Sequence, residues 1–392
     1  SGIPISESLG SYSAIVYKEG NKIFAKKRDG SLIAEGVAGR DDARVIQGAL
    51  NSLSDGRRWK ETVMLTGDFL LEDQIRIPSY TILDLREARL KLKDGVKKTI
   101  IVNKNFRISG LDNSAPRDND IWIIGGEIDG NKRRQDNPGN ACNGITLRKV
   151  DRVLIRGVYI HDAYHHGIAV DAPFSELSSD VRIINCISGN NGVGIGDGIV
   201  FNRVRNGLIE GCSAYGHKKW TGIDVSNCYN CSAVNNFSFK NTHGIVAESW
   251  EIDANRYEDE YRVLIKNNHC RDNEVYGIFI KESNTSLGHP YEIIVNNNTI
   301  KGGGTGIRVL GGEVIIIDTN LIFQPNSKGI FVDDSPYCMI KGNFICSADY
   351  GIHLGSGSDY TFVTHNYLKG IRKQTILNQS NNSLIKENPS FK

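Results

Sequence analysis

The dipeptide Gly-Ile returns at nearly constant intervals through most of this chain, and no other feature restricts the fold as much. Copies that begin at residues 144, 167, 198, 222, 244, 277, 306, 329 and 351 are separated by 23, 31, 24, 22, 33, 29, 23 and 22 residues. A minimum of 22 residues with occasional excess is what a solenoid produces when each repeat is one coil and some coils carry loop insertions. The repeat therefore predicts a solenoid.

The residues around each copy indicate what the coils are made of. The second residue after each isoleucine is apolar or small, and the positions between are mixed. This pattern is typical of a β-strand with one buried face. In a second column an asparagine follows an apolar residue by three, at positions 268, 298, 320, 343 and 366. Stacked asparagines can hydrogen-bond along a ladder and accept left-handed backbone geometry, so this column predicts a bend between two strands.

Two other classes of solenoid do not fit these patterns. The leucine pattern of leucine-rich repeats is missing, and strands of period two together with abundant Gly and Asn exclude helical solenoids. We therefore predict an all-β fold, a single-stranded parallel β-helix, over residues 37–392. Within it, residues 41–53 combine an aspartate at the N-cap position with apolar residues at helical spacing, which predicts a short amphipathic helix that caps the open end of the core. Residues 1–36 are expected to form a β-hairpin extension that turns at residues 19–21.

The composition excludes several classes of partner. The chain has 392 residues, 39% of them apolar, and a formal net charge of +2, which gives no reason to expect nucleic acid or an anionic membrane surface. No run of 18 or more apolar residues occurs, so membrane insertion is not expected. Eight cysteines are too sparse for a disulfide framework in a chain of this length. No coiled-coil heptad is visible, which leaves the oligomeric state open between monomer and trimer.

From Asp41 to about residue 370 the chain resembles the pectin-lyase-like superfamily of right-handed parallel β-helices. This superfamily contains polysaccharide lyases, polygalacturonases, alginate C-5 epimerases and phage tailspikes. The resemblance rests on Asp41-Asp42 before the predicted helix, on the run GGEIDGN at residues 125–131, and on the recurring Gly-Ile coils. It implies a right-handed helix, a groove over one sheet, and polysaccharide as the substrate class. From the size of such polymers we expect an extracellular or surface location, although the sequence opens at Ser1-Gly2 without the features of a secretion signal.

Aligning the coils on Gly-Ile brings polar outward positions into columns on neighbouring strands, about 4.8 Å apart. Titratable and basic groups are concentrated on the coils between residues 166 and 308. The candidate catalytic residues are His243, Tyr276, Lys281, Asp197, Asp224 and Glu248. The candidate substrate-binding residues are His166, Asp171, Asn202, Lys218, Lys219, Trp220 and Arg308. Insertions at residues 171–180, 189–196, 249–261 and 282–291 fall beside the same coils, and we expect them to form the walls of a groove.

The favoured chemistry is that of a lyase or a uronate C-5 epimerase. Both begin by removing the proton alpha to a carboxylate, which requires a base and a cation that neutralises the uronate. His243 and Tyr276 occupy one column on neighbouring coils and could form the acid-base pair, with Lys281 and Arg308 as cations. The resemblance implies a Tyr-Gly-Phe-Asp-Pro-His run for alginate epimerases, and residues 166–171 do not reproduce it.

A polygalacturonase-like glycoside hydrolase is the alternative. The motifs Asp-Gly-Ile at Asp197, His-Gly at His243 and Ile-Lys at Lys281 match those of such enzymes in order, but Thr221 stands where an Asp pair is expected and Phe279 where an arginine is expected. Hydrolysis needs one carboxylic acid and one carboxylate. Asp197 together with Asp224 or Glu248 could supply them.

The third hypothesis is a non-catalytic glycan-binding rod of the tailspike or adhesin type. A rod of this kind should spread its charges evenly and keep its loops short, whereas the insertions here gather on one stretch.

The sequence identifies no metal ligands: the run of metal-binding residue types at residues 161–166 alternates between the two faces of a strand, so zinc is not predicted. Calcium is the cofactor that the resemblance allows, because related lyases use it to bind uronates.

Overall fold

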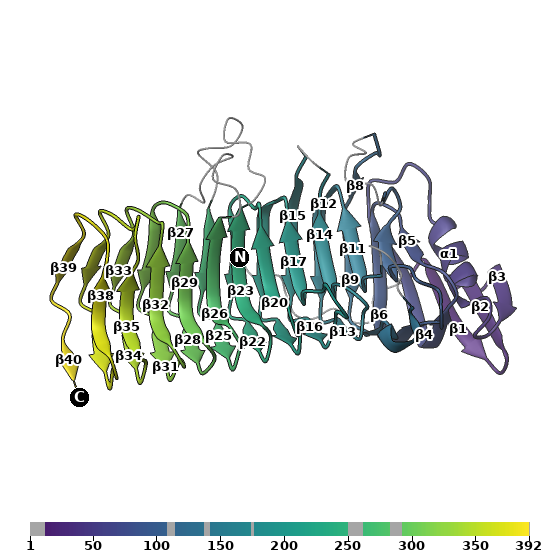
Figure 1. Cartoon of the computed structure of the whole chain (residues 1–392). Coiled ribbons are helices and arrows are strands. Elements are labelled where there is room, and N and C mark those ends of the chain that lie inside the picture. Colours follow the sequence, from purple (N-terminus) through teal and green to yellow (C-terminus); the bar gives the residue numbers. More distant parts are fainter. Residues whose placement is uncertain are drawn as a thin grey trace.

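The computed structural model describes residues 12–107, 114–136, 142–173, 176–249, 262–282 and 292–391. After an N-terminal group of strands and one helix, the chain is a right-handed parallel β-helix, as the sequence predicts (Figure 1). Each coil passes through three strands separated by turns. Successive coils stack on one another from the purple and blue end of the molecule to the yellow end.

The nine strands that carry the Gly-Ile repeat lie together in one sheet of twelve parallel strands, which we call the front sheet. Neighbouring repeats pair in register, so that Ile223 lies opposite Ile245 and Ile245 opposite Ile278. The strands are β5 (Ile75–Ile77), β7 (Ile101–Asn103), β11 (Ile145–Arg148), β14 (Ile168–Asp171), β17 (Ile199–Asn202), β20 (Thr221–Ser226), β23 (His243–Ser249), β26 (Tyr276–Glu282), β29 (Thr305–Leu310), β32 (Lys328–Asp333), β35 (Tyr350–Leu354) and β38 (Gln374–Asn378).

The other strands of the coils stack in two further columns. The second sheet contains β4 (Glu61–Leu71), β6 (Thr81–Leu92), β8 (Asp118–Asn119), β9 (Ile121–Ile124), β12 (Val150–Arg156), β15 (Ser178–Ile184), β18 (Val204–Glu210), β21 (Cys231–Val234), β24 (Val263–Lys266), β27 (Ile293–Asn296), β30 (Ile315–Asp318), β33 (Met339–Lys341), β36 (Phe362–Thr364) and β39 (Leu384–Lys386). The third sheet contains β10 (Glu127–Asp129), β13 (Tyr159–His161), β16 (Ile187–Gly189), β19 (Ser213–Tyr215), β22 (Phe237–Phe239), β25 (His269–Arg271), β28 (Thr299–Lys301), β31 (Leu321–Phe323), β34 (Phe344–Cys346), β37 (Tyr367–Lys369) and β40 (Ser390–Phe391). A short 3-10 helix, η1 (Lys132–Arg134), follows β10.

Glycine recurs before each isoleucine because successive coils approach too closely there for a side chain. A Cβ atom at Gly244 would lie 2.3 Å from the carbonyl oxygen of Gly277, and one at Gly198 would lie 2.4 Å from the carbonyl oxygen of Gly222. Both distances are far below van der Waals contact, and the obstructing atom is backbone that cannot swing away. The repeat that defines the sequence is therefore a packing requirement between neighbouring coils.

The asparagine column forms the predicted ladder, at the bend between the second and third sheets. The side-chain amide of Asn268 donates to Oδ1 of Asn298 at 3.0 Å, and Asn298 donates in the same way to Asn320 at 2.9 Å. Each of these side chains also hydrogen-bonds backbone groups, and all are at most 1% exposed. The ladder satisfies polar groups that the turn buries inside the solenoid.

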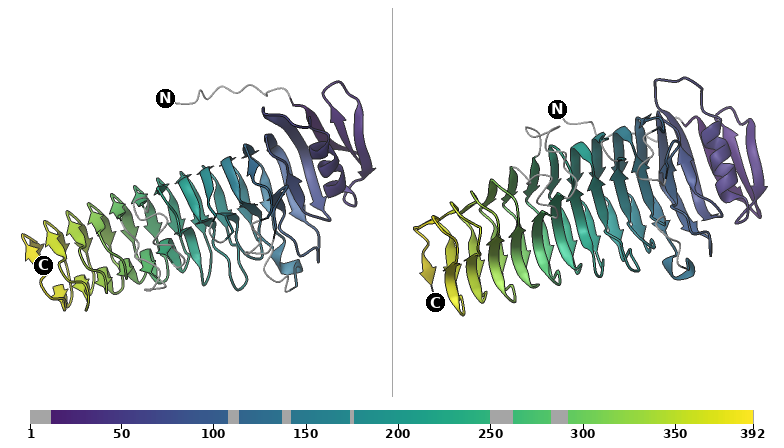
Figure 2. Two further views of the ribbon diagram at one scale, coloured as in Figure 1. Left: turned by 90° about the horizontal axis from the view of Figure 1, so that it is seen from above. Right: turned by 45° about the horizontal axis from the view of Figure 1, so that its top comes forward.

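The N-terminal end is capped as the sequence predicts. The strands β1 (Ala14–Glu19), β2 (Lys22–Lys27) and β3 (Leu32–Val37) pair antiparallel in that order, and helix α1 (Asp42–Asn51) buries its apolar face against the end of the core. Figure 2 shows α1 and these strands at the end opposite the C-terminus. Because β1 also pairs in parallel with β4, the hairpin continues the second sheet. The division of the chain at residue 36 stays a prediction.

One detail of the cap differs from the prediction. Asp41 makes no side-chain cap on α1, and its carboxylate accepts the backbone N–H of Val37 at 2.8 Å. Glu72, from the loop after β4, instead accepts the N–H groups of Ala43 and Arg44, both at 3.0 Å. A carboxylate from elsewhere in the fold thus satisfies the first turn of the helix. No helix in the described part of the chain is long and apolar enough to span a membrane.

Candidate functional site

Three acidic side chains occupy consecutive coils of the front sheet: Asp197 two residues before β17, Asp224 on β20 and Glu248 on β23. Asp224 is half-buried, and Ser226 Oγ donates to its Oδ1 at 2.5 Å. Burial raises the pKa of Asp224 well above its usual range, and the negative charges of Asp197 and Glu248 raise it further. Asp224 therefore keeps its proton to a higher pH than an ordinary aspartate, as a general acid must.

His243 and Tyr276 begin β23 and β26 and lie opposite each other in register. Their rings stack with centroids 5.1 Å apart, and Phe279 packs 4.6 Å from the Tyr276 ring. Burial lowers the pKa of His243; the Asp197 charge opposes this shift and the Lys281 charge reinforces it. His243 Nδ1 is buried and has no hydrogen-bond partner among the described residues. A neutral imidazole of this kind is able to accept a proton.

Lys281 lies two residues after Phe279, on the same face as the stacked pair. Its Nζ is 2.8 Å from Oε1 of Glu248, and the two side chains are 37% and 20% exposed. Glu248 and Lys281 are opposite each other on neighbouring strands, as the alignment of coils predicts. The ammonium group is thus held by one carboxylate but remains accessible to an anionic ligand.

A cavity of about 180 Å³ lies on the same sheet, across β11, β14 and β17, with Thr99 and Phe106 from the segments on either side of β7. Its lining includes three of the predicted substrate-binding residues, His166, Asp171 and Asn202, together with Arg148. Burial raises the pKa of Asp171 to about 6, although the charges of Arg148, Arg203 and His166 lower it. Asp171 Oδ1 and Arg148 Nε are buried without a hydrogen-bond partner in the described part of the chain. Unsatisfied polar atoms in a cavity mark a place where a polar ligand could bind.

His166 connects this cavity to the carboxylates. Its Nδ1 is 3.1 Å from the backbone N of Asp197 and 3.4 Å from Oδ2 of the same residue. An Nδ1 that accepts the backbone N–H carries no proton, so we assign the shorter contact as the hydrogen bond and place the ring proton on Nε2. Asp197 Oδ1 accepts the backbone N–H of Thr221 at 2.7 Å, which fixes this carboxylate with its side chain only 5% exposed.

Lys218, Lys219 and Trp220 lie in the turn directly before β20. Trp220 Nε1 donates to the carbonyl of Gly194 at 2.5 Å, and the Trp220 carbonyl accepts the N–H of His243 at 3.3 Å. The Trp220 side chain is 37% exposed. The turn therefore places a tryptophan and two lysines at the edge of the sheet next to His243, and their contact with substrate stays a prediction.

Arg308 is more enclosed than the sequence suggests. It is 7% exposed, pairs with Asp333 at 3.0 Å and stacks 3.7 Å above the ring of Phe331. Phe331 in turn stacks on His353 with centroids 4.4 Å apart. The sequence analysis predicts a role for Arg308 but not for this row of outward rings. Its signal in the sequence is that Arg308, Phe331 and His353 each directly follow a repeat isoleucine. Of the predicted groove walls, residues 174–175, 250–261 and 283–291 lie outside the described residues.

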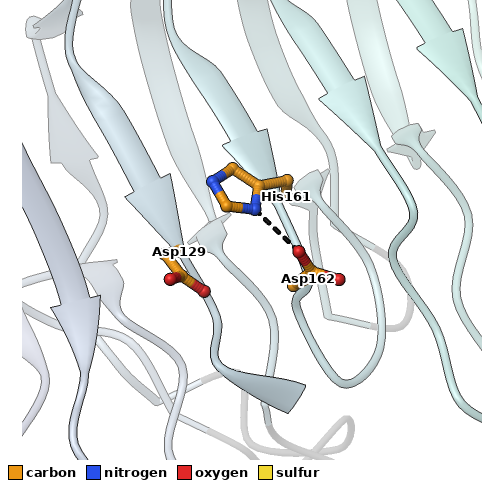
Figure 3. Close-up of side chains that lie close together, drawn as sticks. All are labelled: Asp129, His161 and Asp162. Atoms are coloured by element: carbon orange, nitrogen blue, oxygen red, sulfur yellow. Dashed lines mark hydrogen bonds and ion pairs between the residues drawn. The ribbon is translucent and has the colours of Figure 1, made fainter. Parts of the chain in front are cut away.

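One group of metal-ligand residues occurs in the described part of the chain, and it lies on the third sheet: Asp129, His161 and Asp162 (Figure 3). His161 Nδ1 is 2.8 Å from Asp162, its Nε2 is 3.1 Å from Glu127, and Asp129 lies 3.4 Å from both Arg89 and Lys91. These contacts show that the acidic side chains and His161 belong to an ion-pair network. No comparable group lies on the described front sheet, so calcium there rests on the resemblance alone.

Comparison with known proteins gives one match to a protein family and several to solved structures. The family described as "Periplasmic copper-binding protein (NosD)" matches residues 254–389, which exclude the cluster on the third sheet. No curated protein sequence matches the chain significantly.

Solved structures resemble the chain over most of its length. The A-module of mannuronan C-5 epimerase AlgE4 from Azotobacter vinelandii has a TM-score of 0.74 at 19% identity, with 89% of this chain and 97% of that module covered. The periplasmic alginate epimerase AlgG gives 0.60 at 11% identity, covering 88% and 82%. The tailspike of E. coli bacteriophage HK620, solved with a pentasaccharide, gives 0.66 at 13% identity, covering 90% and 65%. The resemblance to right-handed parallel β-helix proteins is confirmed at the level of the fold.

Proposed function

We propose that the chain binds an acidic, uronate-containing polysaccharide along the front sheet and modifies it by lyase or C-5 epimerase chemistry. The observation that carries this proposal is the neutral His243 stacked on Tyr276 with the half-exposed Lys281 close by. The occurrence of two alginate epimerases and a tailspike solved with a pentasaccharide among the similar structures supports polysaccharide as the substrate class. Because large polysaccharides of this kind occur outside the cytoplasm, we also propose that the protein is located there.

The residues divide the reaction between them. His243 accepts the C-5 proton, because its lowered pKa leaves the imidazole neutral at physiological pH. Lys281 exchanges part of its contact with Glu248 for the substrate carboxylate and so stabilises the charge that develops when the proton leaves. The Tyr276 hydroxyl supplies a proton, to the departing glycosidic oxygen in β-elimination or to C-5 in epimerisation.

Product analysis tests the proposal. Purified protein is incubated with pectate, alginate and glucuronan, with and without calcium, and unsaturated ends are followed by ultraviolet absorbance while deuterium incorporation at C-5 is followed in heavy water. We expect one of these signals, and we expect His243→Ala to abolish it. His365→Ala is the control, since His365 is exposed and pairs with Glu387 away from the front sheet. If the His243 variant keeps full activity, the proposed acid-base pair is wrong.

A glycoside hydrolase is the second candidate, and Asp224 favours it. Its raised pKa gives a protonated carboxyl group beside the ionisable Asp197 and Glu248, which is the combination that hydrolysis needs. New reducing ends without unsaturation or deuterium incorporation would support this candidate. Asp224→Asn should then remove the activity, while His243→Ala would leave part of it.

A further inference from the structure

A second cleft, of about 310 Å³, lies on the outward face of the second sheet. Its lining consists of Lys60, Asp120, Trp122, Arg152, Val153, Leu154, Arg156, Asp180, Arg182 and Ile184. These residues come from β9, β12 and β15, the turns that lead into them, and the residue before β4. None belongs to the front sheet, so the cleft is separate from the candidate site described above.

The floor of the cleft is built by residues in register. Trp122, Leu154 and Arg182 lie opposite one another on three neighbouring strands, and Arg156 and Ile184 face the same way two residues further on. Trp122 and Leu154 are half-buried, whereas Arg182 is exposed. The floor therefore presents an indole and aliphatic side chains on the same face as two arginines.

The charge of the lining is positive. Four cations face two carboxylates, and Asp120 is already held by Lys60 at 3.1 Å and by Arg152 at 2.7 Å. Arg182 forms no ion pair within the described residues. The Lys60 ammonium also lies 4.7 Å from the centre of the Trp122 ring, which helps to hold the indole in place.

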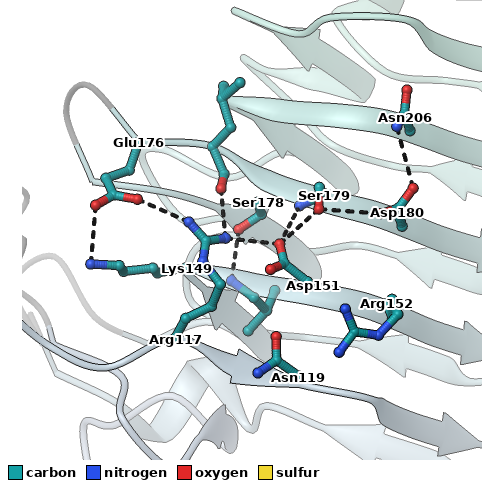
Figure 4. A network of polar contacts seen from close by, with 12 residues as sticks. Arg117, Asn119, Lys149, Asp151, Arg152, Glu176, Ser178, Ser179, Asp180 and Asn206 are labelled. Carbon is teal, nitrogen blue, oxygen red and sulfur yellow. Dashed lines mark hydrogen bonds and ion pairs between the residues drawn. The ribbon is translucent and has the colours of Figure 1, made fainter.

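A polar network fixes the backbone at one edge of this cleft (Figure 4). Arg117 binds Asp151 at 2.8 Å and Glu176 at 2.9 Å, tying the start of β12 to the segment before β15. Figure 4 shows Arg152 and Asp180 on the adjacent strands beside this network. A cleft whose strands are held in this way is organised before a ligand arrives, which lowers the entropic cost of binding.

We propose that the cleft is a second binding site for an acidic sugar, with the pyranose ring against Trp122 and Leu154 and its carboxylate on Arg182. A sugar ring has an apolar face that packs on an indole, and a carboxylate matches the two-pronged donor geometry of a guanidinium. A neutral sugar would leave that guanidinium unused. The choice of a uronate rests on the proposed function, whereas the choice of an anionic sugar rests on the cleft itself. Two sites on one rigid solenoid would hold a polymer more tightly than either alone.

Calorimetric titration of the full chain with short oligouronates tests the inference. We expect two classes of site in the wild type, and Arg182→Glu should weaken one of them roughly tenfold or more while the other is unchanged. Trp122→Leu should weaken the same class. Lys386→Glu is the matched control, since it reverses an exposed charge on β39 of the same sheet. Thermal unfolding of each variant verifies that it is folded.

The possible results test the second site and the proposed function independently of each other. If Arg182→Glu and Lys386→Glu bind alike, or if a neutral oligosaccharide binds the cleft as tightly as a uronate, the inference is overturned. If Arg182→Glu loses one class of site while His243→Ala leaves catalysis intact, the second site stands and the proposed function fails. If substitutions in the front sheet alone abolish all binding, the proposed function is supported and the inference of a second site is overturned.

Discussion

The imidazole of His243 lies nearly parallel to the phenol ring of Tyr276, with the planes 12° apart and the centroids 5.1 Å apart. The stack arises because both residues start neighbouring strands in register, at the position before the repeat glycine. It presents two groups able to exchange protons side by side on one sheet face. The stacking and the chemistry can be tested separately.

Tyr276→Phe keeps the ring and removes the hydroxyl. We expect kcat to fall by roughly 10²- to 10⁴-fold, the range typical of a lost general acid, with little change in folding. Steady-state kinetics on the active polyuronate measures the effect. Tyr360→Phe is the control because Tyr360 is also a stacked tyrosine, 5.3 Å from Tyr337, but away from the site. An unchanged kcat in the Tyr276 variant would show that the hydroxyl takes no part in proton transfer.

The pH dependence of kcat/KM should reflect His243. Because burial lowers the pKa of this group, its neutral form persists to lower pH than an ordinary histidine, whose pKa is about 6.5. Activity should therefore rise with pH through a midpoint below that value. The hydrolase alternative predicts the opposite trend, since Asp224 loses its proton as the pH rises through its elevated pKa. A profile that lacks this rise and only declines with increasing pH would thus favour Asp224 as the acid.

Gly244→Ala should destabilise the solenoid. The added Cβ would lie 2.3 Å from the carbonyl oxygen of Gly277, and relieving that clash requires two coils to move apart. We expect a loss of about 3 kcal/mol in the free energy of unfolding, the upper part of the usual range for overpacking. Gly194→Ala is the control, because a Cβ there meets nothing within 4 Å. Equal melting temperatures for the two variants would contradict the packing explanation of the repeat.

Asn298→Ala should also destabilise the fold, by about 3 kcal/mol, because it leaves buried partners on both sides of the ladder unsatisfied. Asn298 accepts from the backbone and side chain of Asn268 and donates to Asn320 and to the Ile265 carbonyl. Asn388→Ala, at the partly exposed end of the ladder, should cost clearly less. Chemical denaturation of both variants measures the difference, and equal losses would argue against a cooperative ladder.

The sequence by itself determined the solenoid, its coil length, the bend with stacked asparagines and the columns of outward residues. It could do so because each coil packs mainly on the equivalent residues of the next, so one local pattern reports a contact that recurs along the chain. The steric need for glycine at Gly244 and the ladder at Asn298 are direct examples. Once the register was known, the pairing of His243 with Tyr276 and of Glu248 with Lys281 followed.

Only the tertiary structure decided features that depend on side-chain direction or on segments far apart in the chain. Glu72 replaces Asp41 at the start of α1 because the chain after β4 returns to that helix end. The Arg308 side chain stacks on Phe331 and pairs with Asp333. The spacing of residues in the sequence does not determine which rotamer the side chain adopts. The cleft around Trp122 and Arg182 likewise exists because two coils of the helix bring residues 60 positions apart onto the same sheet face, on either side of Leu154.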